Sequence, residues 1–217
     1  MTRRFAVLTA LVLAALTGCA DETPPPAGSA GRLTAAPVAD GPPWYDEIGP
    51  APAAGTVDAV GGCQLPVSFA LAERRVARQA RIPEPEVAEA LGSLVRRGGV
   101  SVRCEIDGHL ARAGFMRVWT SDRPATEPRP VLEAYVAAGE RVSDPTYRTV
   151  RAGTVDAVEA TWTSMSELTG TDEREWALAV PAGQTIVLLT TNESIVDEAA
   201  DVLPGYRLAV RTLSVTG

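Results

Sequence analysis

Apolar and polar residues alternate along much of the chain after residue 64, which predicts a series of β-strands. The alternation is clearest at Val100, Val102, Cys104 and Ile106, which would share one strand face. Residues 186–189 are apolar without alternation, so the strand that contains them should be central and covered on both sides. Strands are predicted over residues 65–71, 100–107, 112–120, 147–151, 154–164, 175–180 and 185–191.

Other segments carry helical signals. Residues 83–97 begin with prolines, end with arginines before Gly98, and place Val87, Leu91, Leu94 and Val95 on one stripe. A second helix is expected over residues 131–138. Ser194 should cap a third helix, which Pro204 should break or kink because proline lacks the N–H that a helix interior requires. A last helix is then expected over residues 205–213.

The order of these elements predicts the fold class. Strands that follow one another with short turns, and helices placed between groups of strands, are typical of an α+β fold in which helices sandwich an antiparallel β-sheet. The Asp107-Gly108 pair is a hairpin signal, so the strands on either side of it should pair directly. We expect one domain over residues 61–217, a length that suits a single core.

The first 18 residues have the pattern of a lipoprotein signal peptide. Arg3 and Arg4 precede an apolar run over residues 5–16 that is too short to span a bilayer. The sequence Leu16-Thr17-Gly18-Cys19 then matches a lipobox, in which the cysteine thiol accepts a lipid. We therefore expect lipidation of Cys19 and a protein anchored on the extracytoplasmic face of the cell membrane. The alternative is an ordinary secretory signal with a chance cysteine.

Residues 19–60 are rich in proline, alanine and glycine and show little periodicity, which predicts a disordered tether. Trp44 and Tyr45 interrupt this composition. Two aromatic residues in a tether form either a short binding motif or a pair that docks back onto the domain, and we favour docking.

Charge and cysteine content narrow the function classes. The formal net charge is −7, all basic residues are arginines, and none of them form a dense cluster, so nucleic acid is not an expected partner. With Cys19 lipidated, Cys63 and Cys104 remain as a pair in an oxidising compartment. A structural disulfide is then the default, and a redox pair is disfavoured because redox cysteines usually lie close together as Cys-x-x-Cys.

No catalytic set of residues is evident, and no cofactor motif is found. His109 is the only histidine and follows the predicted turn at Asp107-Gly108, where an exposed polar residue needs no special role. Glu105, Asp107 and His109 have the spacing of one strand face and are weak candidates for a divalent metal site. We favour a solvated strand face, because the turn would direct His109 away from the carboxylates.

Four aromatic residues occupy positions typical of a core and are candidates for a second role. They could line an apolar pocket between the sheet and a helix, although core packing is the simpler role for each. They are Trp119, Trp162, Trp176 and Tyr206.

Four blocks of sequence carry a resemblance to a known family. They begin at Cys63-Gln64-Leu65-Pro66, Cys104-Glu105-Ile106-Asp107, Gly114-Phe115-Met116-Arg117 and Leu203-Pro204-Gly205-Tyr206. These blocks resemble uncharacterised actinobacterial lipoproteins, and the domain is similar to the wider LpqN- and PsbP-like group. The resemblance implies helices on both faces of the sheet and a bridge between Cys63 and Cys104. It implies no catalytic residues.

Together these observations favour a membrane-anchored lipoprotein that binds an envelope protein or an apolar small molecule without turning it over. The alternative is an envelope hydrolase that acts on esters or with a metal, and a purely structural role is a third possibility. A hydrolase would bring His109 and a carboxylate together in a cleft, whereas a binding protein would have an apolar pocket or patch away from His109.

Overall fold

A computed structural model describes residues 40–58, 62–81, 84–111, 114–165, 170–192 and 199–216. The predicted signal peptide, Cys19 and the first part of the predicted tether lie outside the described residues. So does Ser194, the predicted cap of a helix.

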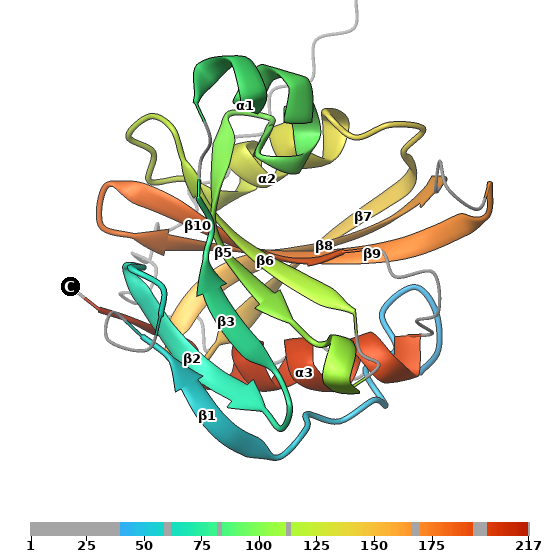
Figure 1. Ribbon diagram of the computed structural model, residues 1–217. Helices are drawn as coiled ribbons and strands as arrows, with labels where there is room; N and C mark the ends of the chain where they lie inside the picture. Colours follow the sequence, from blue (N-terminus) through green and yellow to red (C-terminus); the bar gives the residue numbers. More distant parts are fainter. Residues whose placement is uncertain are drawn as a thin grey trace, which may run out of the picture. The chain divides into compact units, whose positions relative to one another are not determined.

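A large antiparallel sheet forms the centre of the domain (Figure 1). β10 lies in the middle, and its residues Ile186 to Leu189 are all buried, which confirms the prediction of a central strand covered on both sides. The predicted bounds 100–107 are confirmed, whereas the strands predicted at 147–151 and 175–180 are longer than expected. The strand order is β3 (Val76–Gln79), β5 (Val100–Asp107), β6 (Phe115–Ser121), β10 (Thr185–Asn192), β9 (Asp172–Ala182), β8 (Val155–Met165) and β7 (Ser143–Ala152).

One face of the sheet is covered by α1 (Pro85–Leu91) and α2 (Pro128–Ala137), which lie above it in Figure 1. α2 buries Leu132, Tyr135 and Val136 against side chains of β6, β8, β9 and β10. We call this side the α2 face.

The opposite face is covered by α3 (Ala199–Thr212) and by a small sheet, which lie below the large sheet in Figure 1. The small sheet has the order β1 (Ala53–Val57), β2 (Val67–Ala72) and β11 (Ser214–Val215). Phe69, Trp176, Leu203 and Tyr206 belong to the core on this side. The molecule is therefore an α+β fold with antiparallel sheets, as predicted, with helices on both faces of the large sheet.

The disulfide between Cys63 and Cys104 is present, with a Cα–Cα distance of 5.8 Å. Cys63 precedes β2 of the small sheet and Cys104 lies on β5 of the large sheet, and both are buried. The bridge therefore joins the two sheets covalently.

The prediction of a helix over residues 83–97 is wrong for the second half of that range. α1 ends at Leu91, a 3₁₀ turn follows, and Arg96–Arg97 form a short strand, β4, that pairs with β5. Gly98 and Gly99 both have positive φ, so they form a two-residue hairpin turn and bring β4 back along β5. The expected apolar stripe is exposed at Val87, Leu91 and Leu94, and of its four residues only Val95 is buried.

The break predicted at Pro204 is also wrong, because α3 continues through it. Pro204 lies near the beginning of the described helix, where the missing N–H removes a single bond to the carbonyl of Ala200. The carbonyl of Pro204 accepts a hydrogen bond from the N–H of Ala51 at 2.8 Å, so this turn also holds the N-terminal segment.

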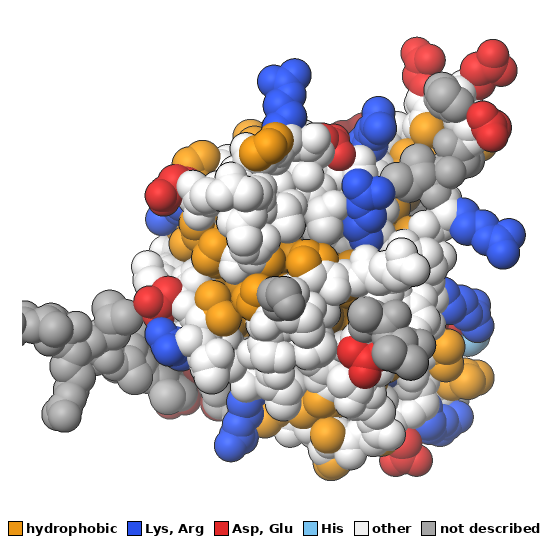
Figure 2. Space-filling model, turned by 90° about the vertical axis from the view of Figure 1, so that its left-hand side faces the viewer, with side chains coloured by type: hydrophobic (Ala, Val, Ile, Leu, Met, Phe, Trp, Pro, Cys, Tyr) orange, Lys and Arg blue, Asp and Glu red, His pale blue; other side chains and the backbone are white. Residues whose placement is uncertain are grey.

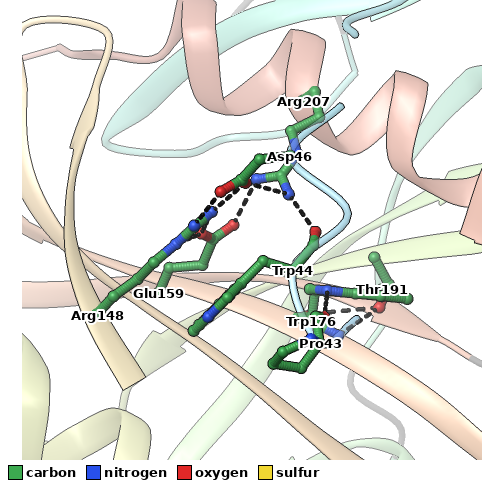
Figure 3. Close-up of polar contacts among 8 residues, drawn as sticks. All are labelled: Pro43, Trp44, Asp46, Arg148, Glu159, Trp176, Thr191 and Arg207. Atoms are coloured by element: carbon green, nitrogen blue, oxygen red, sulfur yellow. Dashed lines mark hydrogen bonds and ion pairs between the residues drawn. The ribbon is translucent and has the colours of Figure 1, made fainter. Parts of the chain in front are cut away.

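Residues 40–58 pack on the domain, which corrects the prediction that the disordered tether reaches residue 60. β1 pairs with β2, and Trp44 is buried in the core on the α3 side. The indole N–H of Trp176 donates to the carbonyl of Pro43 (Figure 3). The rings of Tyr45 and Trp176 meet edge to face. The docking favoured for Trp44 and Tyr45 is therefore confirmed.

Four charged side chains fix this segment in place, and we call them the clasp: Asp46, Arg148, Glu159 and Arg207 (Figure 3). Arg148 donates to Asp46 at 2.7 Å and to Glu159 at 2.7 Å. Arg207 donates to Glu159 at 3.0 Å and to Asp46 at 3.2 Å, and also to the carbonyl of Trp44. Each carboxylate therefore contacts both guanidinium groups. The clasp ties the N-terminal segment to β7, β8 and α3.

Burial and charge act in opposite directions on the clasp. Burial works to lower the pKa of Arg148, but hydrogen bonds and charges from Asp46 and Glu159 outweigh it and raise that pKa above its ordinary value. The Glu159 side chain is only 1% exposed. Burying a charge this deeply is unfavourable unless its charged partners stay in place.

We expect Asp46→Asn to lower the free energy of unfolding by about 3 kcal/mol, because it leaves two buried guanidinium groups with one carboxylate between them. Urea denaturation monitored by tryptophan fluorescence measures the change. Asp156→Asn is the matched control, since Asp156 pairs with Arg151 on the same two strands but is 58% exposed. It should cost less than about 1 kcal/mol. Equal losses in the two variants would contradict a stabilising role for the clasp.

We expect the double variant Cys63→Ala, Cys104→Ala to lose about 4 kcal/mol of stability, because the bridge closes a long loop in the unfolded chain. Chemical denaturation under oxidising conditions measures this loss. Cys19→Ala should leave the domain's stability unchanged. Labelling of the unfolded, unreduced Cys19→Ala chain should find no free thiol, and two labelled thiols would show that the bridge does not form.

Candidate functional site

The α2 face of the large sheet is only partly covered, and a pocket of about 500 Å³ lies where the cover ends. Its floor comes from β6, β8 and β9, and its walls come from the C-terminal end of α2 and from the segment that follows α1. A volume of this size is typical of sites for small molecules.

A buried carboxylate lies on the floor of the pocket. Glu175 is 7% exposed, and its Oε1 accepts hydrogen bonds from the indole N–H of Trp162 at 3.2 Å and from the hydroxyl of Ser164 at 2.5 Å. β9 alternates its side chains, so Glu175 shares a face with Ala177 and Ala179, which contact the core under α2. The two donors hold Glu175 against the sheet.

An aromatic wall rises beside this carboxylate. Tyr135 of α2 meets Trp119 edge to face at 5.4 Å between ring centroids, and meets Trp162 at 6.2 Å. The indole N–H of Trp119 donates to the hydroxyl of Thr190 at 3.0 Å. Because these rings hold one another, the wall is formed before any ligand arrives.

Burial raises the pKa of the Tyr135 phenol above its ordinary value. The negative charge of Glu175 raises it further, while the positive charge of Arg97 acts in the opposite direction. Tyr135 is therefore neutral throughout the physiological range and contributes an apolar ring and a hydroxyl group rather than a charge.

Two arginines line the pocket in different ways. The guanidinium of Arg97 stacks over the ring of Tyr135 at 4.3 Å from its centroid, and its Nε donates to the carbonyl of Tyr135 at 3.0 Å. Arg117 pairs with Glu105 at 3.0 Å. The pocket therefore combines apolar surface with cationic groups in fixed positions.

The weak metal candidates do not come together as one site. The carboxylate of Glu105 binds Arg117, and Asp107 accepts a hydrogen bond from the backbone N–H of His109 at 2.8 Å. His109 is exposed in a 3₁₀ turn after β5 and is not among the residues that line the pocket. In the ranges that the structure describes, no three histidine, cysteine or acidic side chains are grouped to hold a metal ion.

The four candidate aromatics divide between the two faces of the sheet. Trp119 lines the pocket and Trp162 supports its floor, whereas Trp176 and Tyr206 pack in the core on the α3 side. Sequence reasoning missed Arg97, Tyr135 and Glu175. A signal for Glu175 existed, because strand alternation places it with the buried Ala177 and Ala179, where an unpartnered acid is not expected.

Figure 2 shows the face of the molecule that lies at the left of Figure 1, where hydrophobic side chains gather in a band across the middle. Arginine and acidic side chains are interspersed around its edge. This face therefore carries mixed charge in the described part of the chain.

Stability should fall as the pH rises above 10, because folded Tyr135 keeps its proton while the unfolded chain releases it. Such a group changes the free energy of unfolding by up to about 1.4 kcal/mol per pH unit. Urea denaturation at a series of pH values should give a shallower decline for Tyr135→Phe than for the unmodified chain. Identical declines would show that Tyr135 titrates normally. Tyr206, whose pKa burial also raises, remains in both proteins and cancels in the comparison.

Comparison with known proteins gives one family. Residues 34–213 match a family of uncharacterised lipoproteins, a range that includes the docked N-terminal segment, the large sheet, β1 and β2 of the small sheet, and helices α1, α2 and α3. No curated protein matches the chain. Among the described residues, no helix is both long and apolar enough to cross a membrane. Since the match covers most of its length, the chain belongs to this family of uncharacterised lipoproteins.

Proposed function

We propose that this lipoprotein is anchored through lipid on Cys19 at the extracytoplasmic face of the membrane and binds a small molecule with an apolar body in the pocket on the α2 face. The pocket carries this proposal, because its aromatic wall is formed by packing within the protein and its size suits a small ligand. An envelope protein as partner is the other possibility that the sequence left open.

We also propose a structural relationship and a source for this lipoprotein. Helices on both faces of the large sheet support a relation to the LpqN- and PsbP-like group. The exclusive use of arginine over lysine supports an actinobacterial origin with a high-GC genome.

The position of His109 supports binding over catalysis. A serine or cysteine hydrolase with histidine as its base would need this residue, the only histidine in the chain, beside the pocket. His109 is absent from the pocket lining, and the serine that does line the floor, Ser164, donates its hydroxyl to Glu175. We therefore propose a carrier or sensor in preference to an envelope hydrolase.

Native mass spectrometry on the full-length chain, extracted from its own membranes in a mild detergent, tests this proposal. We expect an added mass that disappears on denaturation. The protein must retain residues 40–58, because a version trimmed to residue 55 would lose Trp44 and Asp46 from the folded domain.

Two variants distinguish a ligand bound in the pocket from a ligand bound elsewhere on the protein. Ala138→Trp should fill the pocket and remove the added mass, because Ala138 lines it. Ala137→Trp is the matched control on the same helix, exposed and outside the lining, and should retain the added mass. A bare protein mass in the unmodified chain, or retention of the ligand by Ala138→Trp, would contradict the proposal.

A further inference from the structure

Arg97 lacks the carboxylate partner that the other arginine of the pocket, Arg117, has within the described residues. Arg117 and both arginines of the clasp are paired with carboxylates. Arg97 has a hydrogen bond to the carbonyl of Tyr135 and two aromatic rings beneath it, and among the described residues no carboxylate lies within ion-pair distance of it. Its charge therefore has no direct ion-pair partner within the described part of the protein.

Arg97 is also held in one place. The bond to Tyr135 fixes its Nε, and the ring of Tyr135 supports the plane of the guanidinium. Gly139 lies against the guanidinium so closely that a Cβ at this position would collide with its Nη2. A guanidinium fixed in this way has already lost much of its conformational entropy, so less is lost when it binds a partner.

A half-buried cation without a counter-charge is costly, and an anion in the pocket would relieve that cost. Arg97 is only partly exposed, and burying a charge is unfavourable unless it is paired. A guanidinium presents its N–H groups in a fork that matches two oxygens of a carboxylate or phosphate. Arg117, also in the lining, is already paired with Glu105, so of the two arginines Arg97 is the one open to an anion.

The acidic residues of the pocket limit where such an anion can lie. Glu175 and Glu140 also line the pocket. Glu175 accepts hydrogen bonds from Trp162 and Ser164 at the floor, whereas Arg97 stacks on Tyr135 in the wall. An anion therefore has to bind at the wall near Arg97, with the rest of the molecule directed away from Glu175.

The end of α1 and the turn that follows it supply a surface for an apolar body. Leu91 and Leu94 line the pocket, and they are 39% and 51% exposed. Trp119 adds an aromatic ring at the floor. Large apolar side chains exposed at the edge of a pocket are typical of a binding surface.

We propose that the pocket binds an organic anion, with its carboxylate or phosphate group on Arg97 and its apolar body against Leu91, Leu94 and Trp119. This inference rests on the proposed function, because it assigns the chemistry of the ligand to the same pocket. It gives Arg97 the role of a specificity-determining residue that selects acids over neutral molecules of the same shape.

Titration calorimetry on the full-length chain tests the inference with four probes: octanoate, octyl phosphate, octan-1-ol and inorganic phosphate. We expect each octyl acid to bind at least about tenfold more tightly than the alcohol, since a charge-assisted pair contributes about that much. Inorganic phosphate should bind weakly because it lacks the apolar body. Whichever octyl acid binds more tightly identifies the anionic group.

Three single-residue variants test whether Arg97 causes the preference for acid over alcohol. Arg97→Met should reduce the preference for acid over alcohol to about one. Arg96→Met is the matched control, because Arg96 is the neighbour on β4, exposed and outside the pocket lining, and it should keep the preference. Gly139→Ala should also weaken acid binding, since its Cβ displaces Arg97 without removing a charge from the chain. Thermal unfolding of each variant establishes that it is folded.

The outcomes separate this inference from the proposed function. Equal binding of acid and alcohol, tight binding of inorganic phosphate, or an acid preference that survives Arg97→Met would overturn the anion assignment. A ligand mass in the native spectrum would still support a pocket-binding protein in those cases. Failure of both octyl acids to bind also overturns the anion assignment, and the native spectrum then decides the proposed function by itself.

Discussion

The pairing of two carboxylates, one of them fully buried, with two guanidinium groups is the constraint on which the arrangement of this domain depends. Asp46 comes from the N-terminal segment, Arg148 and Glu159 from neighbouring strands, and Arg207 from α3. Removing four charges from water costs several kcal/mol for each ion, and their mutual contacts are the main interactions that offset that cost. The four groups are therefore favourable only together, which fixes three separate parts of the chain relative to one another.

The two faces of the large sheet are covered to different extents, and the pocket is a consequence of this difference. On one side α3, the small sheet and the docked N-terminal segment together bury a continuous core. On the other side α2 has ten residues, about 15 Å of helix, over a sheet whose seven main strands extend about 29 Å from edge to edge. The α1 segment covers part of the remainder. Arg117 of β6 and Met165 of β8 are left partly exposed beyond it.

The sequence pattern correctly predicted strands whose burial depends only on the order of apolar and polar residues within the strand. The strand at 100–107 and the central strand β10 were found because side-chain alternation and continuous apolarity follow directly from burial on one or two faces. The helix over 83–97 failed because consecutive glycines at Gly98 and Gly99 turned Arg97 into a strand residue. The site could not be found in this way, since Arg97 meets Tyr135 through a contact that spans 38 residues of sequence. The proline-rich composition of residues 40–58 concealed a segment held by charge pairs.

The docking of residues 40–58 also sets how far the domain can extend from a membrane. A chain anchored at Cys19, as we propose, meets the folded domain by residue 40 at the latest, rather than at residue 61. At about 3.4 Å per residue, the greatest possible separation between lipid and domain falls from about 140 Å to about 70 Å. The clasp therefore limits the distance between the folded domain and the bilayer. Any molecule that enters or leaves the pocket must do so within that distance of the membrane.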